Sequence, residues 1–136
     1  MLIVDASAVS ELLLARPAGR AVALSLRDAE FDLHAPHLLD VEVLSALRRL
    51  VATGDASPER ASEAVADLLD LPIERYGHDA LAPRIWELRD IFSAYDAVYV
   101  ALAEAIAEGG APLLTSDGRL ARVAATHTEV HVILAN

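Results

Sequence analysis

The stretch Leu2-Ile3-Val4-Asp5-Ala6-Ser7-Ala8 decides how this chain is expected to fold. Its three apolar residues in a row are typical of a short strand that is buried on both faces. Asp5 ends this apolar run, and a helix can begin directly behind it because Asp is a favoured N-cap residue. A buried strand that leads at once into a helix predicts the first unit of a parallel α/β sheet.

The rest of the chain alternates strand patterns with amphipathic helix patterns, separated by breaks at Pro17, Pro36, Gly54 and Gly109. Strands are predicted at Leu2–Asp5, Phe31–Ala35, Ile73–Tyr76, Leu113–Thr115 and Val130–Leu134. Helices are predicted at Ser7–Leu14, Gly19–Arg27, Leu38–Ala52, Ser57–Leu71, Leu81–Ile91, Tyr95–Glu108 and Gly118–Ala124. This order predicts a single α/β domain over residues 1–136, with a mostly parallel central sheet covered by helices on both faces.

Composition excludes several kinds of protein. The chain has no cysteine, which rules out disulfides, thiolate zinc sites and a cysteine nucleophile. No apolar run approaches the roughly 20 residues that span a bilayer, so we expect a cytoplasmic protein without a signal peptide or membrane contact. Eleven arginines and no lysine stand against 21 acidic residues, a net charge of −10. This charge opposes non-specific binding of nucleic acid and favours a basic partner.

Four carboxylates occupy positions where an ordinary domain prefers apolar or neutral residues: Asp5, Glu42, Asp96 and Asp117. Asp5 and Asp117 each follow an apolar strand pattern, and ligands of parallel sheets bind beyond the carboxyl ends of the strands. Like charges that converge raise one another's pKa unless a cation neutralises them. If the four side chains meet, the expected occupant is a hard divalent ion such as Mg²⁺.

Each of these acids also has a structural interpretation. Asp5 and Asp117 are favoured cap or turn residues, and Glu42 lies just beyond an apolar helix face near a helix N-terminus, where an acid is favourable. Asp96 could complete a capping box with Ser93, yet it lies within the apolar arc of its helix. Burying an unpaired charge is costly, so Asp96 needs a partner, and the joint pattern of the four acids favours a functional site.

Five segments together resemble the PIN-domain ribonucleases of the VapC toxin type: Leu2–Ala8, Leu39–Val43, Leu88–Asp90, Ser93–Glu104 and Leu113–Ala121. The match follows the whole chain in order and spacing, and Tyr95–Glu104 is its most specific part. The resemblance implies a PIN-like α/β/α sandwich and an endoribonuclease that depends on Mg²⁺ or Mn²⁺. It also implies an RNA substrate, a homodimer and neutralisation by a cognate VapB-type antitoxin.

By position, the resemblance implies that Asp5 and Asp96 are the main metal ligands. Glu42 and Asp117 would complete the acidic cluster by orienting waters or by admitting a second ion. Thr115 is expected to act with the four acids in catalysis. A metal-activated water would cleave the phosphodiester bond and leave 3′-hydroxyl and 5′-phosphate ends.

Three polar residues complete the predicted site region. Ser7 matches a polar position that supports the site in this family. Arg89 and Arg119 lie near site acids in the sequence and are predicted to contact phosphate, with surface salt bridges as the alternative. If the chain is a toxin, its dimer face is expected to involve the segments Ser57–Leu71 or Ala80–Ile91.

Two other functions fit parts of the sequence. An aspartate-based phosphotransfer domain would place its nucleophile at Asp5, but such domains use a lysine near the phosphate and this chain has none. A non-catalytic binding module with the PIN fold would share the architecture, and the intact set of acids argues against it. The histidines lack zinc-binding spacing and are expected to have surface or core roles: His34, His37, His78, His127 and His131.

Overall fold

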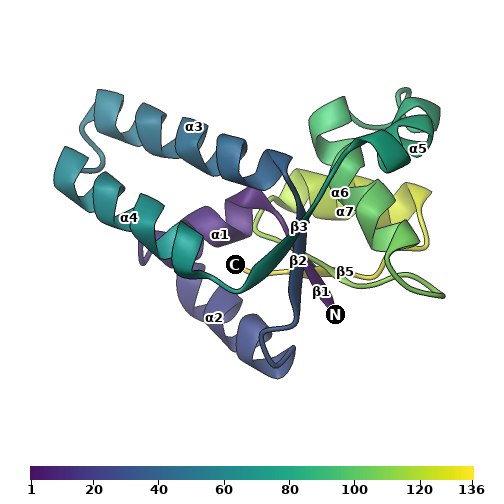
Figure 1. Cartoon of the computed structure of the whole chain (residues 1–136), viewed down its shortest axis with the longest axis horizontal. Helices are drawn as coiled ribbons and strands as arrows, with labels where there is room; N and C mark the ends of the chain where they lie inside the picture. The colour runs from purple at the N-terminus through teal and green to yellow at the C-terminus, as the bar shows by residue number, and fades with distance from the viewer.

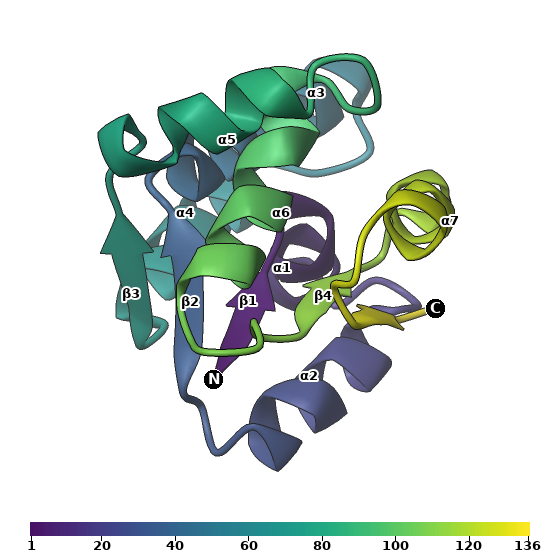
Figure 2. The same cartoon turned by 90° about the vertical axis from the view of Figure 1, so that its right-hand side faces the viewer.

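The computed structural model describes all 136 residues, and a sheet of five parallel strands lies at its centre. The strands are β1 (Leu2–Val4), β2 (Leu33–Pro36), β3 (Ile73–Tyr76), β4 (Leu113–Thr115) and β5 (Val132–Leu134). Their order across the sheet is β3-β2-β1-β4-β5, so the first strand lies in the middle, as Figure 2 shows. The predicted parallel sheet is confirmed, and it is parallel throughout.

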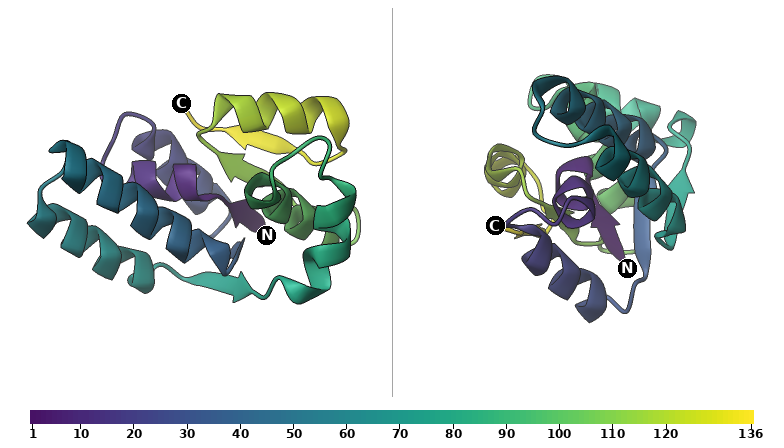
Figure 3. Two further views of the ribbon diagram at one scale, coloured as in Figure 1. Left: turned by 90° about the horizontal axis from the view of Figure 1, so that it is seen from above. Right: turned by 90° about the vertical axis from the view of Figure 1, so that its left-hand side faces the viewer.

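Seven helices connect the strands and cover both faces of the sheet, which makes an α/β/α sandwich (Figure 1). They are α1 (Ala6–Leu13), α2 (Gly19–Asp28), α3 (Leu38–Thr53), α4 (Pro58–Asp70), α5 (Ala82–Glu87), α6 (Ala94–Ala105) and α7 (Gly118–His127). Helix α6 contacts β1, β2 and β4, while α1 packs against α2 and α3. Helices α3 and α4 form a pair that extends beyond the sheet (Figure 3).

The hydrophobic core explains why β1 and α6 occupy central positions. Every residue of β1 is buried, as is the run Ala97–Ala103 of α6, whose side chains are apolar on all sides of the helix. Such a helix has no polar face to present to water and is therefore stable only inside the protein. No helix is both long and apolar enough to cross a lipid bilayer.

Strand register brings the ends of β1 and β4 to the same edge of the sheet. Ile3 pairs with Leu113 and Val4 pairs with Leu114, so both strands end side by side. The N–H of Asp5 then donates to the carbonyl of Leu114 at 3.1 Å. The residues that follow β1 and β4 therefore face one another at the edge where parallel sheets bind ligands.

Most predicted boundaries lie within one residue of those in the structure, and five differ by more. Strand β5 begins at Val132 instead of Val130, and α7 continues to His127, beyond the predicted end at Ala124. Strand β2 begins at Leu33 instead of Phe31 because Glu30 and Phe31 adopt left-handed φ angles of 53° and 58° in a turn. The predicted helix Leu81–Ile91 divides into a 3₁₀ turn at Asp79–Leu81 and the short α5. Helix α6 ends at Ala105, before the predicted end at Glu108.

Candidate active site

Asp5 lies at the carboxyl end of β1 and is buried, with 4 % of its surface exposed. Its Oδ1 accepts hydrogen bonds from the Ala8 N–H at 2.9 Å and the Ser7 hydroxyl at 2.7 Å. Its Oδ2 accepts one from the Thr115 hydroxyl. Asp5 is thus the N-cap of α1, as its structural interpretation predicted. Burial raises its pKa to about 6, although the three hydrogen bonds lower it, and the charge of Asp117 contributes to the rise.

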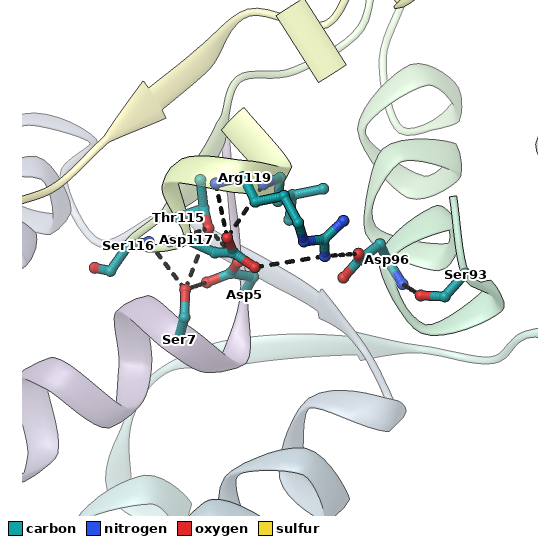
Figure 4. A network of polar contacts seen from close by, with 9 residues as sticks. Asp5, Ser7, Ser93, Asp96, Thr115, Ser116, Asp117 and Arg119 are labelled. Carbon is teal, nitrogen blue, oxygen red and sulfur yellow. Dashed lines mark hydrogen bonds and ion pairs between the residues drawn. The ribbon is translucent and has the colours of Figure 1, made fainter. Parts of the chain in front are cut away.

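Two hydroxyl groups connect Asp5 to the turn that follows β4 (Figure 4). Thr115 is fully buried, donates to Asp5 and accepts the Asp117 N–H at 3.0 Å. Ser7 donates to Asp5 and accepts the Ser116 N–H at 2.9 Å. Because each hydroxyl has only one proton, both protons are used on Asp5, while the oxygens orient the turn. Thr115 and Ser7 therefore hold Asp5 and the start of α7 in a fixed relation.

Asp117 begins α7 and uses its two oxygens differently. Its Oδ1 accepts the N–H groups of Arg119 at 2.9 Å and Leu120 at 3.2 Å, which makes it an N-cap. Its Oδ2 faces the Arg119 guanidinium, with Nη2 at 3.7 Å. The same nitrogen lies 2.6 Å from Oδ2 of Asp96, so one arginine bridges acids from two helices (Figure 4).

Asp96 lies in the first turn of α6, with 20 % of its side chain exposed. Its backbone N–H donates to the Ser93 hydroxyl at 3.2 Å, and Ser93 is the N-cap. The predicted capping box is only half formed, because the Asp96 carboxylate binds Arg119 instead of reaching back to Ser93. The partner that this partly buried charge requires is therefore Arg119, whose own pKa is raised by hydrogen bonding to Asp96 and by the charge of Asp117.

Glu42 reaches the site from α3. The Tyr99 hydroxyl, one turn beyond Asp96 on α6, donates to Oε1 of Glu42 at 2.7 Å. Burial raises the pKa of Glu42, the hydrogen bond from Tyr99 lowers it, and the charges of Asp5 and Asp96 contribute to the rise. Burial also raises the pKa of Tyr99 far above its ordinary value, so the phenol stays a hydrogen-bond donor.

The structure thus brings the four predicted acids to one edge of the sheet from β1, α3, α6 and the start of α7. No three acidic or histidine side chains approach closely enough to ligate one ion together. Arg119 instead supplies a positive charge between Asp96 and Asp117. Arg89 contacts none of the acids; its guanidinium lies 4.7 Å from the centre of the Trp86 ring.

The hydrogen bond from Tyr99 to Glu42 was not among the contacts predicted from the sequence. The available signal was the position of Tyr99 three residues after Asp96, which places both side chains on one face of the helix. Among the histidines, His34 has the core role that was one of the two expected. It is buried, with Nδ1 2.8 Å from the Tyr76 hydroxyl and Nε2 2.8 Å from Asp32.

A groove of about 690 Å³ opens beside the acids and is lined by residues of α1 and α3. Ser7 and Glu42 line it next to the acid cluster, and Arg16 and Arg49 also contribute to its wall. The hydroxyl of Ser116, also in the lining, has no hydrogen-bond partner within the protein. The groove therefore offers space next to the carboxylates, and its two arginines are matched in number by Glu11 and Glu42 in the same lining.

The fold and its acidic edge define a PIN domain, and residues 2–126 match the family model described as "PIN domain". The chain therefore belongs to the PIN-domain family, among the relatives of VapC proteins. Ribonuclease VapC12 of Mycobacterium tuberculosis is 39 % identical over 133 residues, which cover 98 % of this chain and 99 % of that protein. Ribonuclease VapC3 of the same species is 42 % identical over 120 residues, covering 88 % and 85 %. VapC ribonuclease Mb0985 of Mycobacterium bovis is 38 % identical over 133 residues, covering 98 % of both. The predicted family resemblance is confirmed.

Proposed function

We propose that this protein is the toxin of a toxin–antitoxin pair and acts as a divalent-metal-dependent endoribonuclease. The observation that carries this proposal is the meeting of Asp5, Glu42, Asp96 and Asp117 at the carboxyl edge of the sheet, beside an open groove. The proposal is supported by relatives that are named ribonuclease VapC and match nearly the whole chain.

The donor set fits a hard ion such as Mg²⁺, with Mn²⁺ as the alternative. Every available donor is an oxygen, and such ligands suit these ions. Mg²⁺ keeps several waters and takes only one or two carboxylates directly, so it does not need three converging acids. Asp5 and Asp96 would hold the ion, while Glu42 and Asp117 would orient waters or hold a second ion. When bound, the ion would lower the pKa of a water and polarise the phosphate.

The protein's own residues would position this chemistry and the RNA. Thr115 and Ser7 fix the orientation of Asp5 by hydrogen bonds, and Tyr99 does the same for Glu42. The groove between α1 and α3 would receive the RNA strand, since it begins at the acids and Arg49 in its wall forms no ion pair within the protein. Of the two arginines predicted to contact phosphate, we retain only Arg119, because it stands at the site.

The chain lacks a residue that a phosphotransfer domain with Asp5 as nucleophile would need. Such a domain needs a cation that neutralises the transferred phosphate, and the chain has no lysine for this role.

The proposal includes a homodimer and a VapB-type antitoxin. Both segments predicted for the dimer face expose a large apolar side chain, Leu69 at 68 % and Trp86 at 69 %. Each side chain would be covered if its segment formed the interface. The net charge of −10 suits a basic antitoxin segment. Light scattering of the purified chain would test the dimer, and a monomer at micromolar concentration would contradict it.

The enzyme assay compares the wild type with Asp96→Asn on a long single-stranded RNA, with Mg²⁺ or with a chelator. We expect cleavage by the wild type only with metal, and none by Asp96→Asn, which should fold normally because Ser93 still caps α6. The matched control is Asp90→Asn, an exposed acid that makes no ion pair or side-chain hydrogen bond. Full activity of Asp96→Asn would remove this residue from the site, and cleavage in the chelator would contradict the metal requirement.

A further inference from the structure

Arg119 is the one cation that forms ion pairs with the acids of the candidate site. Its Nη2 lies 2.6 Å from Asp96 Oδ2 and 3.7 Å from Asp117 Oδ2, as the close view in Figure 4 shows. Its side chain is 56 % exposed, whereas its backbone N–H is fixed by the Asp117 cap. The guanidinium can therefore leave the acids for solvent without disturbing the start of α7.

Most other oxygens of the four carboxylates already accept hydrogen bonds. Both oxygens of Asp5, Oδ1 of Asp117 and Oε1 of Glu42 have donors within the protein. The oxygens left are Oε2 of Glu42, Oδ1 of Asp96, and the two that face Arg119. A metal ion that uses Oδ2 of Asp117 or Oδ2 of Asp96 therefore meets the Arg119 guanidinium first.

We propose that Arg119 is the resident counterion of Asp96 and Asp117 and that a divalent ion displaces it from these two carboxylates when it binds. This inference rests on the proposed function, because it concerns how the metal enters that site. Arg119 offsets part of the negative charge of Asp96 and Asp117 while no ion is bound. Its displacement frees a guanidinium at the edge of the site, where an RNA phosphate would arrive, so metal binding precedes phosphate binding by this residue.

The test measures Mn²⁺ affinity by calorimetry in the absence of RNA, for the wild type, Arg119→Gln and Arg122→Gln. Arg122 is the matched control, since it lies one turn further along α7, is exposed and forms no ion pair. A partly exposed ion pair is a weak competitor, so we expect Arg119→Gln to bind Mn²⁺ roughly fivefold more tightly. We expect Arg122→Gln to stay within about twofold of the wild type, because salt screens distant charges.

A second measurement separates displacement from simple repulsion between two cations. In wild-type protein with ¹⁵N-labelled arginine, the guanidinium signals of Arg119 should shift when Mg²⁺ saturates the site, and those of Arg122 should not. Equal Mn²⁺ affinity of Arg119→Gln and the wild type, or Arg119 signals that do not move, would overturn this inference and leave the proposed function intact. Absence of Mn²⁺ binding by all three proteins would refute the metal-dependent function, and this inference with it.

Discussion

Replacing Asp5 by asparagine is expected to stabilise the protein at neutral pH while it abolishes the proposed activity. In the folded chain the pKa of Asp5 is raised to about 6 from an ordinary value of 3.8, chiefly by burial. At about 1.4 kcal/mol per pKa unit, this shift corresponds to roughly 3 kcal/mol of stability lost when the carboxyl ionises in the fold. An asparagine never ionises, so it avoids this loss.

The sign follows from proton binding. Between pH 3.8 and about 6 the folded state keeps the Asp5 proton more firmly than the unfolded state does, so stability falls as pH rises through this window. About 2 kcal/mol of the loss develops between pH 4.5 and pH 7.5. The free energy of unfolding of Asp5→Asn, relative to that of the wild type, should therefore rise by about 2 kcal/mol from pH 4.5 to pH 7.5.

The local hydrogen bonds can adapt to an asparagine at position 5. Its oxygen can accept from the Ala8 N–H and the Ser7 hydroxyl, as Oδ1 of the aspartate does. Its NH₂ group would donate to Thr115, whose hydroxyl proton can turn toward Ser7, 3.2 Å away. No buried polar group loses its partner, so the removed charge dominates the change in stability.

Urea unfolding at pH 4.5 and pH 7.5, with a chelator present, measures this effect. Asp90→Asn is the control, because Asp90 is exposed and its replacement should change stability equally at both pH values. The reasoning would be refuted if Asp5→Asn were less stable than the wild type by the same margin at both pH values. In a separate measurement without chelator, Mn²⁺ should stabilise the wild type and leave the stability of Asp5→Asn unchanged.

Three further substitutions test the support around the site and the packing beneath it. Tyr99→Phe should cost about 1–2 kcal/mol in urea unfolding and raise the pKa of Glu42 further, since this carboxylate loses its only donor; an unchanged stability would show that water replaces the phenol. Thr115→Val should cost about 2–3 kcal/mol because two buried hydrogen bonds disappear, whereas Thr115→Ser should recover most of the loss; equal losses would point to packing instead. Gly19→Ala should lower the melting temperature by an amount equivalent to about 1–3 kcal/mol, because its Cβ would lie 2.5 Å from a carbonyl oxygen of α1. Gly118→Ala has no atom within 4 Å and should be neutral or stabilising, so similar effects of the two would argue against the clash.

The sequence predicts the elements because their signals are local. Gly54 ends α3 with a φ of 81°, and Ser57 caps α4 with Pro58 at its first position, as expected from residue type alone. The start of β2 was misplaced because a left-handed Phe31 carries no signal in its residue type. Backbone hydrogen bonds to the end of α2 hold this turn, such as the one from the Phe31 N–H to the Leu26 carbonyl at 2.9 Å.

The sequence predicted the four acids of the candidate site but only some of the contacts that they make. Asp5 and Asp117 follow strands, and the register of β1 with β4 explains why they meet. The Asp96–Arg119 pair joins positions 23 residues apart, and the Tyr99–Glu42 bond joins positions 57 apart. Such pairs depend on how α3, α6 and α7 pack, which no local pattern records.

The two acids that follow strands each cap the start of a helix and also belong to the proposed site. Asp117 divides this work within one carboxylate, since Oδ1 holds the first turn of α7 and Oδ2 remains for the site. Asparagine at position 117 would still cap α7 through its oxygen but would lose part of what the carboxylate offers the site. Alanine would lose both the cap and the site oxygen, and the first turn of α7 would fray. Under the proposed function, loss of activity without loss of folding is therefore expected mainly from amide substitutions at these two acids.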